Sequence, residues 1–241
     1  MIKTAVISAA GKGTRMKELA KDKPKHMIEV NGKPFLWYLI ENLRAAGFDD
    51  LIIVVGHLCQ HIEKFAESYP HKLTIVNQYG VMGEEVYGTA VPIMAAKEAV
   101  DGKPFIAVYG DNLYSVRDLK AMNHDDGLCY VGGLPHENWQ KYGVLIPGSN
   151  QELKEIIEKP DHDVGSKLIN TGLYTFTQDI LEACKHVKPT PPKNELYLTD
   201  AITELASQGK VMIQPIQDYW KDFGSPEDVG TVSRFLIERS K

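Results

Sequence analysis

The chain has few cysteines and no long hydrophobic run. Its three cysteines, Cys59, Cys129 and Cys184, are widely separated and odd in number, which fits neither a disulfide framework nor a zinc site and favours a reducing compartment. The longest aliphatic run, 51–55, is far too short to span a membrane. The apolar segment 5–10 is shorter than the apolar region of a signal peptide, and charged residues follow it at once. These absences predict a cytoplasmic protein with no membrane partner.

The chain also lacks an excess of positive charge. Its 27 Lys and Arg residues against 32 Asp and Glu residues give a net charge of −5, so no overall positive field would hold a nucleic acid backbone. Basic residues such as Arg15, Lys25 and Lys159 are therefore interpreted as local partners for a small anion. The 241 residues, 43% of them hydrophobic, suffice for one large α/β core, and we predict a single domain over 1–241.

Hydrophobic periodicity in the first half predicts strands that alternate with helices. The expected strands are 4–9, 51–55, 73–76 and 105–109, and the expected helices lie near 35–43, 62–66 and 89–100. Such alternation favours a mostly parallel, doubly wound α/β sheet of the Rossmann-like kind. Ligands bind beyond the carboxyl ends of the strands in such sheets. The segment 11–15 and Asp111 each follow a strand, so we expect them to meet in one crevice.

After about residue 127 the pattern changes to short strands and turns. The candidate strands are 128–132, 143–146, 153–157 and 169–176. They predict a small antiparallel or mixed insertion that covers the active edge of the sheet. Helices are expected near 177–185 and 198–208, and a last strand near 211–216. Ser225 and Pro226 then open a terminal helix as its N-cap and first residue.

The loop Gly11-Lys12-Gly13-Thr14-Arg15 is the first segment that points to chemistry. Closely spaced glycines after a strand let backbone N–H groups approach a phosphate, and Arg15 adds a forked donor. A dinucleotide fingerprint needs Gly or Ala at the position of Met16, and a P-loop needs Gly-Lys followed directly by Ser or Thr. A flexible turn without a ligand stays open as an alternative.

Lys25 follows Pro24 next to an apolar stretch. A lysine held there could neutralise charge on a transferring phosphorus atom. The alternative is a solvated lysine in a charged loop. Taken alone, this segment favours that alternative.

Together the two segments resemble the opening signature of the sugar nucleotidyltransferases, the nucleoside-diphosphate-sugar pyrophosphorylases. The similarity is greatest to the glucose-1-phosphate thymidylyl- and uridylyltransferase branch. It continues in the family's order through nearly the whole chain. The further matching segments are Gly88-Thr89-Ala90, Gly110-Asp111-Asn112, Tyr142-Gly143-Val144, Glu158-Lys159-Pro160, Asn170-Thr171-Gly172 and 220–226. Each segment alone is weakly specific, but their common order is highly specific.

The resemblance implies a GT-A-like fold with a nucleotide-binding half of about 1–126 and a sugar-phosphate-binding half of about 127–241. It assigns site residues to four roles. The catalytic residues are Arg15 and Lys25; the nucleotide-binding residues are Ala10, Gly11, Gly13, Thr14, Gln78, Gly88 and Thr89; the sugar-phosphate-binding residues are Gly143, Glu158, Lys159, Asn170 and Thr171; the metal ligands are Asp111 and Asp222.

The implied reaction joins a nucleoside triphosphate to a sugar 1-phosphate and releases pyrophosphate. Arg15 would hold the triphosphate tail, Lys25 the α-phosphate and Lys159 the sugar phosphate. Mg²⁺ prefers carboxylate oxygens together with substrate phosphates, so Asp111 and Asp222 would share one ion as Lewis acid and template. The attacking sugar phosphate is already an anion, so no general base is required.

The resemblance leaves the base and the sugar open. UTP or dTTP with a hexose 1-phosphate is favoured, and the alternatives are CTP with a phosphorylated alcohol such as phosphocholine, or a non-catalytic regulator that binds a sugar nucleotide. The family's base-recognition glutamine is not clearly placed. Gln78 is the nearest candidate, but the segment 79–87 is long and acidic. A homo-oligomer is also considered, because Val229, Val232 and Leu236 form an apolar face of the terminal helix.

Overall fold

The first half of the chain builds the parallel part of a central sheet. The computed structural model describes residues 1–191 and 194–239. The strands β1 (Thr4–Ala9), β4 (Asp50–Val55), β5 (Thr74–Asn77) and β6 (Phe105–Tyr109) lie in the order β6-β1-β4-β5 and are all parallel. β1 and β6 lie in the interior of the sheet and are largely buried, which explains their continuous apolar sequences. The predicted bounds of these two strands are confirmed.

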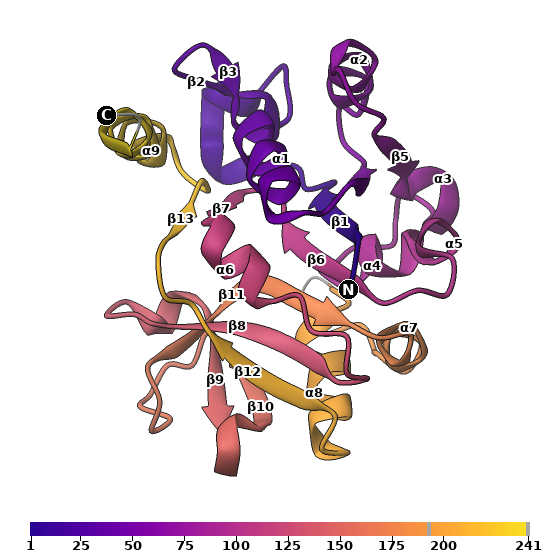
Figure 1. Cartoon of the computed structure of the whole chain (residues 1–241), viewed down its shortest axis with the longest axis vertical. Helices are drawn as coiled ribbons and strands as arrows, with labels where there is room; N and C mark the ends of the chain where they lie inside the picture. The colour runs from indigo at the N-terminus through magenta and orange to yellow at the C-terminus, as the bar shows by residue number, and fades with distance from the viewer. Residues whose placement is uncertain (192–193, 240–241) are drawn as a thin grey trace.

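Helices connect the parallel strands and cover both faces of the sheet (Figure 1). They are α1 (Phe35–Ala46), α2 (Gln60–Ser68), α3 (Gln78–Met82), α4 (Val91–Ala95) and α5 (Lys97–Val100), and α6 (Val116–Ala121) follows β6 in the chain. α1 ends where Gly47 takes the left-handed conformation at φ 99°. The single helix predicted over 89–100 is wrong: α4 and α5 are separated at Ala96, whose ψ of −6° interrupts the regular helical path.

The second half extends the same sheet, so the predicted insertion is continuous with the parallel part. β11 (Leu168–Phe176) pairs antiparallel with β6 and with β8 (Cys129–Pro135), and it meets β9 (Gly143–Pro147), which pairs antiparallel with β10 (Leu153–Glu158). β12 (Val211–Pro215) adds to β8 in parallel, which completes a nine-stranded mixed sheet among the described residues. α7 (Asp179–Cys184) and α8 (Leu198–Ser207) pack against each other and close this half.

Two short strands that the sequence did not predict pair with each other although they are far apart in the chain. β7 (Asn112–Tyr114) pairs antiparallel with β13 (Trp220–Asp222). Figure 1 shows the chain leaving β12 in the second half and crossing to β13 beside the first half, where α9 (Pro226–Arg239) ends the described chain. A hairpin of β2 (Glu29–Val30) and β3 (Lys33–Pro34) lies on the same side. The 3₁₀ segments of the described residues are η1 (Thr14–Ala20), which is kinked at Lys17, η2 (Lys25–Met27), η3 (Trp139–Lys141) and η4 (Ser149–Gln151).

The apolar face of α9 packs against the chain's own core. Val232 is 1% exposed, and Val229 and Leu236 are partly buried against the same hydrophobic cluster. This face is therefore used within the chain, and it no longer supports the homo-oligomer considered from the sequence. Over the described part of the chain, no helix combines the length and the apolar character that crossing a membrane requires.

Candidate active site

The glycine-rich loop begins at the carboxyl end of β1, as the sequence predicts. Gly13 is left-handed at φ 64°, and η1 follows it directly, so Thr14 and Arg15 of the loop lie in the first turn of η1. A Cβ on Gly13 would lie 3.4 Å from Cβ of Lys25, so the loop packs closely on the segment that carries this lysine. Gly11 has open space around its missing Cβ, and Thr14 and Arg15 are exposed. The loop backbone at Gly11 and the Arg15 side chain are therefore accessible at the end of β1.

Lys25 and His26 belong to the turn η2, which packs against the residues that follow β6. The Lys25 ammonium contacts the Asp111 carboxylate, and both side chains are mostly buried. His26 is 1% exposed and packs on Gly110, where an added Cβ would lie 3.1 Å from the imidazole Cδ2. Burial, together with the Lys25 charge, lowers the pKa of His26 to about 3. The imidazole is thus neutral and packs inside the protein.

The pairing of β7 with β13 brings the two predicted metal ligands together. Asp222 is the register partner of Asn112, and the Phe223 N–H donates to the Asp111 carbonyl at 2.8 Å. Burial and the negative charge of Asp111 raise the pKa of Asp222 to about 6. Residues 111 apart in the chain therefore form one carboxylate pair, as the resemblance implied.

Arg15 lies beside this carboxylate pair. An added Cβ on Gly224 would lie 3.1 Å from the Arg15 Nη2 atom and 3.2 Å from Oδ1 of Asp222. Gly224 therefore provides the space in which the guanidinium approaches the end of β13. The charge of Arg15 also helps to lower the pKa of Asp111, after the larger effect of Lys25, although burial acts in the opposite direction.

The second half contributes Gly143 and Glu158 from paired strands. They are register partners in β9 and β10, and a Cβ on Gly143 would lie 3.1 Å from Oε1 of Glu158. Glu158 keeps access to solvent, yet the surrounding protein partly desolvates its carboxyl and raises its pKa. Lys159 follows at φ 44°, an unusual conformation for a non-glycine residue, and its N–H donates to the Tyr142 carbonyl at 3.0 Å.

Several predicted ligands use their side chains inside the protein. The Thr171 hydroxyl is 1% exposed and donates to the Gly132 carbonyl at 2.8 Å, so it faces the interior and not a sugar. The Asn170 amide bonds the Tyr174 hydroxyl and the Gly172 N–H.

The first half of the chain shows the same pattern. The Thr89 hydroxyl accepts the N–H of Leu198 at 2.9 Å, and Gly88 lies against the Leu196 backbone, where a Cβ would be 2.2 Å from the carbonyl oxygen. Gln78 is 5% exposed in α3, and its Oε1 has no protein partner. Gly88 and Thr89 therefore hold the second half against the first, and Gln78 offers an inward-facing amide.

Tyr142 is a site residue that the sequence reasoning missed. Burial and the Asp222 charge raise the pKa of its hydroxyl, and Arg15 lowers it, so the hydroxyl lies near both groups. Its ring makes edge contacts with Trp220 at 5.5 Å and His136 at 5.2 Å. The sequence contained an indication of its place in the site, because Tyr142 precedes Gly143 in a segment that matches the family. Only Gly143 of that segment was predicted to bind the sugar phosphate.

The carboxylate pair suits a hard divalent cation. Within residues 1–191 and 194–239, no cluster of three or more His, Cys, Asp or Glu side chains could hold a metal ion. Mg²⁺ is often bound through one or two carboxylates and completes its shell with substrate phosphates. Two neighbouring carboxylates, one of them with a raised pKa, form a donor set of this kind. The residues present therefore fit the predicted metal.

Known proteins of related sequence span the whole chain. A family model described as "Nucleotidyl transferase" matches residues 4–239. The UTP–glucose-1-phosphate uridylyltransferase AglF of Haloferax volcanii is 33% identical over 98% of this chain and 97% of its own. The bifunctional protein GlmU of Methanocaldococcus jannaschii is 30% identical over 98% of this chain, which spans 54% of that longer protein.

Solved structures give the same result for the fold. A UDP-glucose pyrophosphorylase complexed with UDP-glucose superposes with a TM-score of 0.87 at 25% identity, covering 99% of this chain and all of the other. An inositol-1-phosphate CTP transferase from T. maritima, at 17% identity over 98% of this chain and 95% of its own, has a TM-score of 0.81 and shows the shared fold alone. The full-length family match and the similarity to AglF show that the chain belongs to the nucleotidyl transferase family.

Proposed function

We propose that the chain transfers the nucleotidyl group of UTP or dTTP to a hexose 1-phosphate and releases pyrophosphate. Glucose 1-phosphate is the favoured acceptor and UTP the favoured donor, because the relative AglF is named for that pair. The observation that carries the proposal is the convergence of Arg15, Lys25, Asp111 and Asp222 at one edge of the sheet. Two cations and two carboxylates in that arrangement match the charges of a reaction between two phosphates.

The cations have distinct places in the proposed reaction. Arg15 extends from the loop after β1, so its planar fork can bind the triphosphate tail in two hydrogen bonds. Lys25 lies deeper and contacts Asp111. When a cation and the nucleotide reach the carboxylates, the Lys25 ammonium would move from Asp111 to the α-phosphate. The charge that develops during transfer would then meet a donor already positioned for it.

The acceptor would bind on the second half. Glu158 accepts hydrogen bonds from sugar hydroxyls. Gly143 packs closely on Glu158, and because it has no side chain it leaves room for the sugar ring beside the carboxylate. Lys159 neutralises the sugar phosphate. Its left-handed backbone conformation directs the chain away from β10 at the point where the sugar would lie.

Mg²⁺ is the proposed cofactor, held by Asp111 and Asp222. When bound, it would neutralise phosphate charge and align the two substrates. Asp111→Asn is expected to lower metal-supported turnover by about two to three orders of magnitude, because loss of an electrostatic stabiliser of the transition state has that effect in other enzymes. A cytoplasmic location remains part of the proposal, supported by three cysteines that all carry free thiols.

A pyrophosphate-release assay across a matrix of nucleoside triphosphates and acceptors tests the function. The acceptors include several sugar 1-phosphates, phosphocholine and inositol 1-phosphate, each with Mg²⁺ or with a chelator. Release with UTP or dTTP and a hexose 1-phosphate supports the proposal and identifies both substrates. Release only with CTP and a phosphorylated alcohol would replace it. Tight sugar-nucleotide binding without turnover in any combination would indicate the non-catalytic regulator.

A further inference from the structure

A buried carboxylate outside the site holds the segment that carries Asp222. Asp118, on the first turn of α6, is 2% exposed. Its Oδ1 accepts the N–H of Gln217 at 2.8 Å, and its Oδ2 accepts the N–H of Asp218 at 3.0 Å. The Ser115 hydroxyl donates to the same Oδ2 at 2.7 Å and accepts the N–H of Asp118 at 2.9 Å. One side chain therefore satisfies two consecutive backbone donors about one hundred residues away in the chain.

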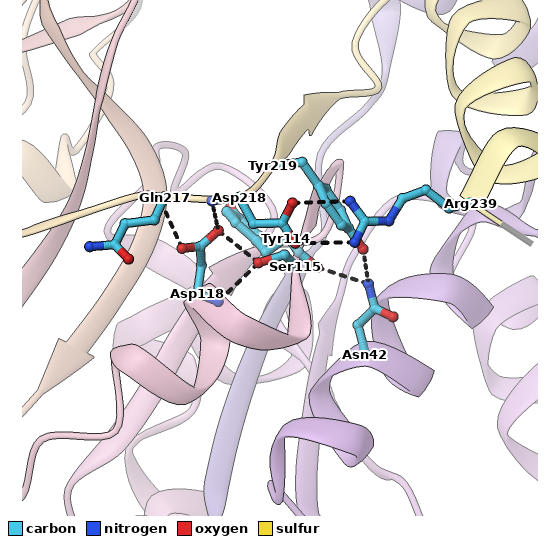
Figure 2. A network of polar contacts seen from close by, with 8 residues as sticks. All are labelled: Asn42, Tyr114, Ser115, Asp118, Gln217, Asp218, Tyr219 and Arg239. Carbon is cyan, nitrogen blue, oxygen red and sulfur yellow. Dashed lines mark hydrogen bonds and ion pairs between the residues drawn. The ribbon is translucent and has the colours of Figure 1, made fainter.

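The same segment is held from other directions. Figure 2 shows Asp118 pointing to Gln217 and Asp218, while Arg239 reaches Asp218 from α9. Two guanidinium nitrogens of Arg239 contact the two Asp218 oxygens at 3.0 and 3.2 Å. We call residues 216–219, between β12 and β13, the strap.

The next residue of the strap, Tyr219, is fixed through both its backbone and its side chain. Its carbonyl accepts the N–H of Ser115 at 3.2 Å, and its hydroxyl accepts the amide of Asn42 at 2.9 Å (Figure 2). Asn42 also donates to the Tyr114 carbonyl at 2.8 Å. The strap is therefore joined to α1 and to the end of β7 immediately before β13 begins.

This arrangement matters because β13 is only three residues long. Its ladder aligns Trp220 with Tyr114 and Asp222 with Asn112. A shift by one residue turns every side chain of a strand to the opposite face. Three residues cannot specify their register by hydrophobic pattern, and Asp222 must face the crevice beside Asp111. Contacts beyond the ladder therefore help to set the register, among them the hydrogen bond of the Trp220 indole to the Thr171 carbonyl at 3.1 Å and the contacts of the strap.

We propose that Asp118 is a positioning residue that sets the register of β13 on β7 and thereby places Asp222 beside Asp111 for metal binding. The inference rests on the proposed function, since it treats Asp222 as a metal ligand. Asp118 is separate from the substrate-binding groups, and it acts through the backbone of the strap. Asp118→Asn removes this support, because an amide offers one acceptor oxygen and turns an NH₂ donor toward the second backbone N–H.

The test compares Asp118→Asn with Asp126→Asn in the full chain. Asp126 serves as an exposed control: its carboxylate also accepts a backbone N–H, from Leu128 at 3.1 Å, and a hydroxyl, from Tyr130 at 2.6 Å, and both partners lie outside the strap. Ser115→Ala is a milder second variant, which keeps the carboxylate and removes one of its donors. Far-UV circular dichroism establishes that each variant is folded.

The first readout is hydrogen–deuterium exchange without metal or substrate. Asp118→Asn is expected to accelerate exchange of the amides in 217–223 and to leave the amides of β1 and β6 unchanged, with Ser115→Ala showing a smaller change of the same kind. The second readout is Mn²⁺ affinity with UTP present, measured by electron paramagnetic resonance. It should weaken about tenfold, the usual effect of removing a group that orients a metal ligand. The KM for UTP should change less than about twofold, because the phosphate loop is on another element.

The outcomes separate this inference from the proposed function. Unchanged exchange in 217–223, unchanged Mn²⁺ affinity, or acceleration spread equally over β1 and β6 would overturn the positioning role of Asp118. An equal loss of metal affinity in Asp126→Asn would also overturn it. Absence of pyrophosphate release by the wild-type protein would instead refute the proposed function, while the exchange and Mn²⁺ measurements would still decide the role of Asp118.

Discussion

Replacing Asp222 by asparagine is expected to stabilise the metal-free protein while removing metal-supported turnover. Burial and the charge of Asp111 raise the pKa of Asp222 from 3.8 to about 6 in the folded chain. Between these values the folded state binds more protons than the unfolded state. The free energy of unfolding therefore falls as the pH rises through this window, and it stays lowered above it. Ionised Asp222 thus destabilises the fold at neutral pH.

The magnitude follows from the shift. Two pK units at about 1.4 kcal/mol each give an upper value of about 3 kcal/mol. The side chain is partly exposed, and solvent screening reduces the effect to about 2 kcal/mol. For a chain of this size, that change raises the melting temperature by roughly 4–8 °C.

Thermal unfolding in a chelator measures this effect. Asp222→Asn should melt higher than the wild type at about pH 8, and the difference should vanish at about pH 4, where Asp222 is protonated in the folded wild type. Asp101→Asn, an exposed loop position, serves as the control and should change little at either pH. Adding Mg²⁺ and UTP should stabilise the wild type alone, because a ligand that binds only the folded state shifts the equilibrium toward it.

One result would refute the reasoning. If Asp222→Asn melted lower than the wild type by the same amount at both pH values, the Asp222 charge would not be destabilising. The carboxylate would then serve the fold through ordinary hydrogen bonds, and its assignment as a group reserved for a cation would lose its physical basis.

Three further outcomes are expected. Arg15→Lys should raise the KM for UTP about tenfold in steady-state kinetics, since lysine cannot make the two parallel hydrogen bonds of the guanidinium; an unchanged KM would remove Arg15 from the triphosphate site. Gly88→Ala should lower the free energy of unfolding in urea by more than about 3 kcal/mol, because its Cβ would clash with the Leu196 carbonyl at φ 136°, whereas Gly230→Ala, with open space around it, should be neutral or stabilising. His26 should contribute a loss of stability as the pH falls from about 6.5 toward about 3, opposite in sign to the contribution of Asp222, because the unfolded state takes up a proton that the buried imidazole does not. On going from about pH 7.5 to about pH 5, the free energy of unfolding measured in urea should fall by about 2 kcal/mol relative to that of His26→Phe, and an identical change in the two proteins would show that His26 titrates normally.

The parallel part of the fold could be predicted because its signal is local. β1 and β6 are continuous apolar runs that end at glycine-rich loops, and their bounds were predicted to the residue. The helix over 89–100 was mispredicted, because its periodicity continues through Ala96 although the backbone does not. Thr89, at its expected start, instead bonds Leu198 across the molecule, a contact that no local pattern reveals.

Arg15 and Asp111 could be singled out from local chemistry, whereas Lys25 and Asp222 were expected only from the family resemblance. Only Arg15 supplies a forked donor in its loop, and Asp111 follows a buried strand directly. The side chains of Thr171 and Asn170 were harder to assign, since hydroxyl and amide groups bond the backbone as readily as a ligand. Their hydrogen bonds to Gly132 and Tyr174 depend on the pairing of strands far apart in sequence.

The pairing of β7 with β13 could not be predicted from the sequence at all. Two strands of three residues contain no periodicity, and they lie about one hundred residues apart. Asp118 accepts hydrogen bonds from the backbone N–H groups of residues 217 and 218. Almost any residue type would provide these groups, so the amino acids at the two positions do not indicate the contact. The proposed metal ligands are thus identified by their side-chain type, whereas the proposed positioning residue Asp118 contacts only main-chain N–H groups of the strap. Substitutions at Asp118 should consequently impair metal binding more than substitutions of the strap residues that it contacts, provided that those replacements keep their N–H groups.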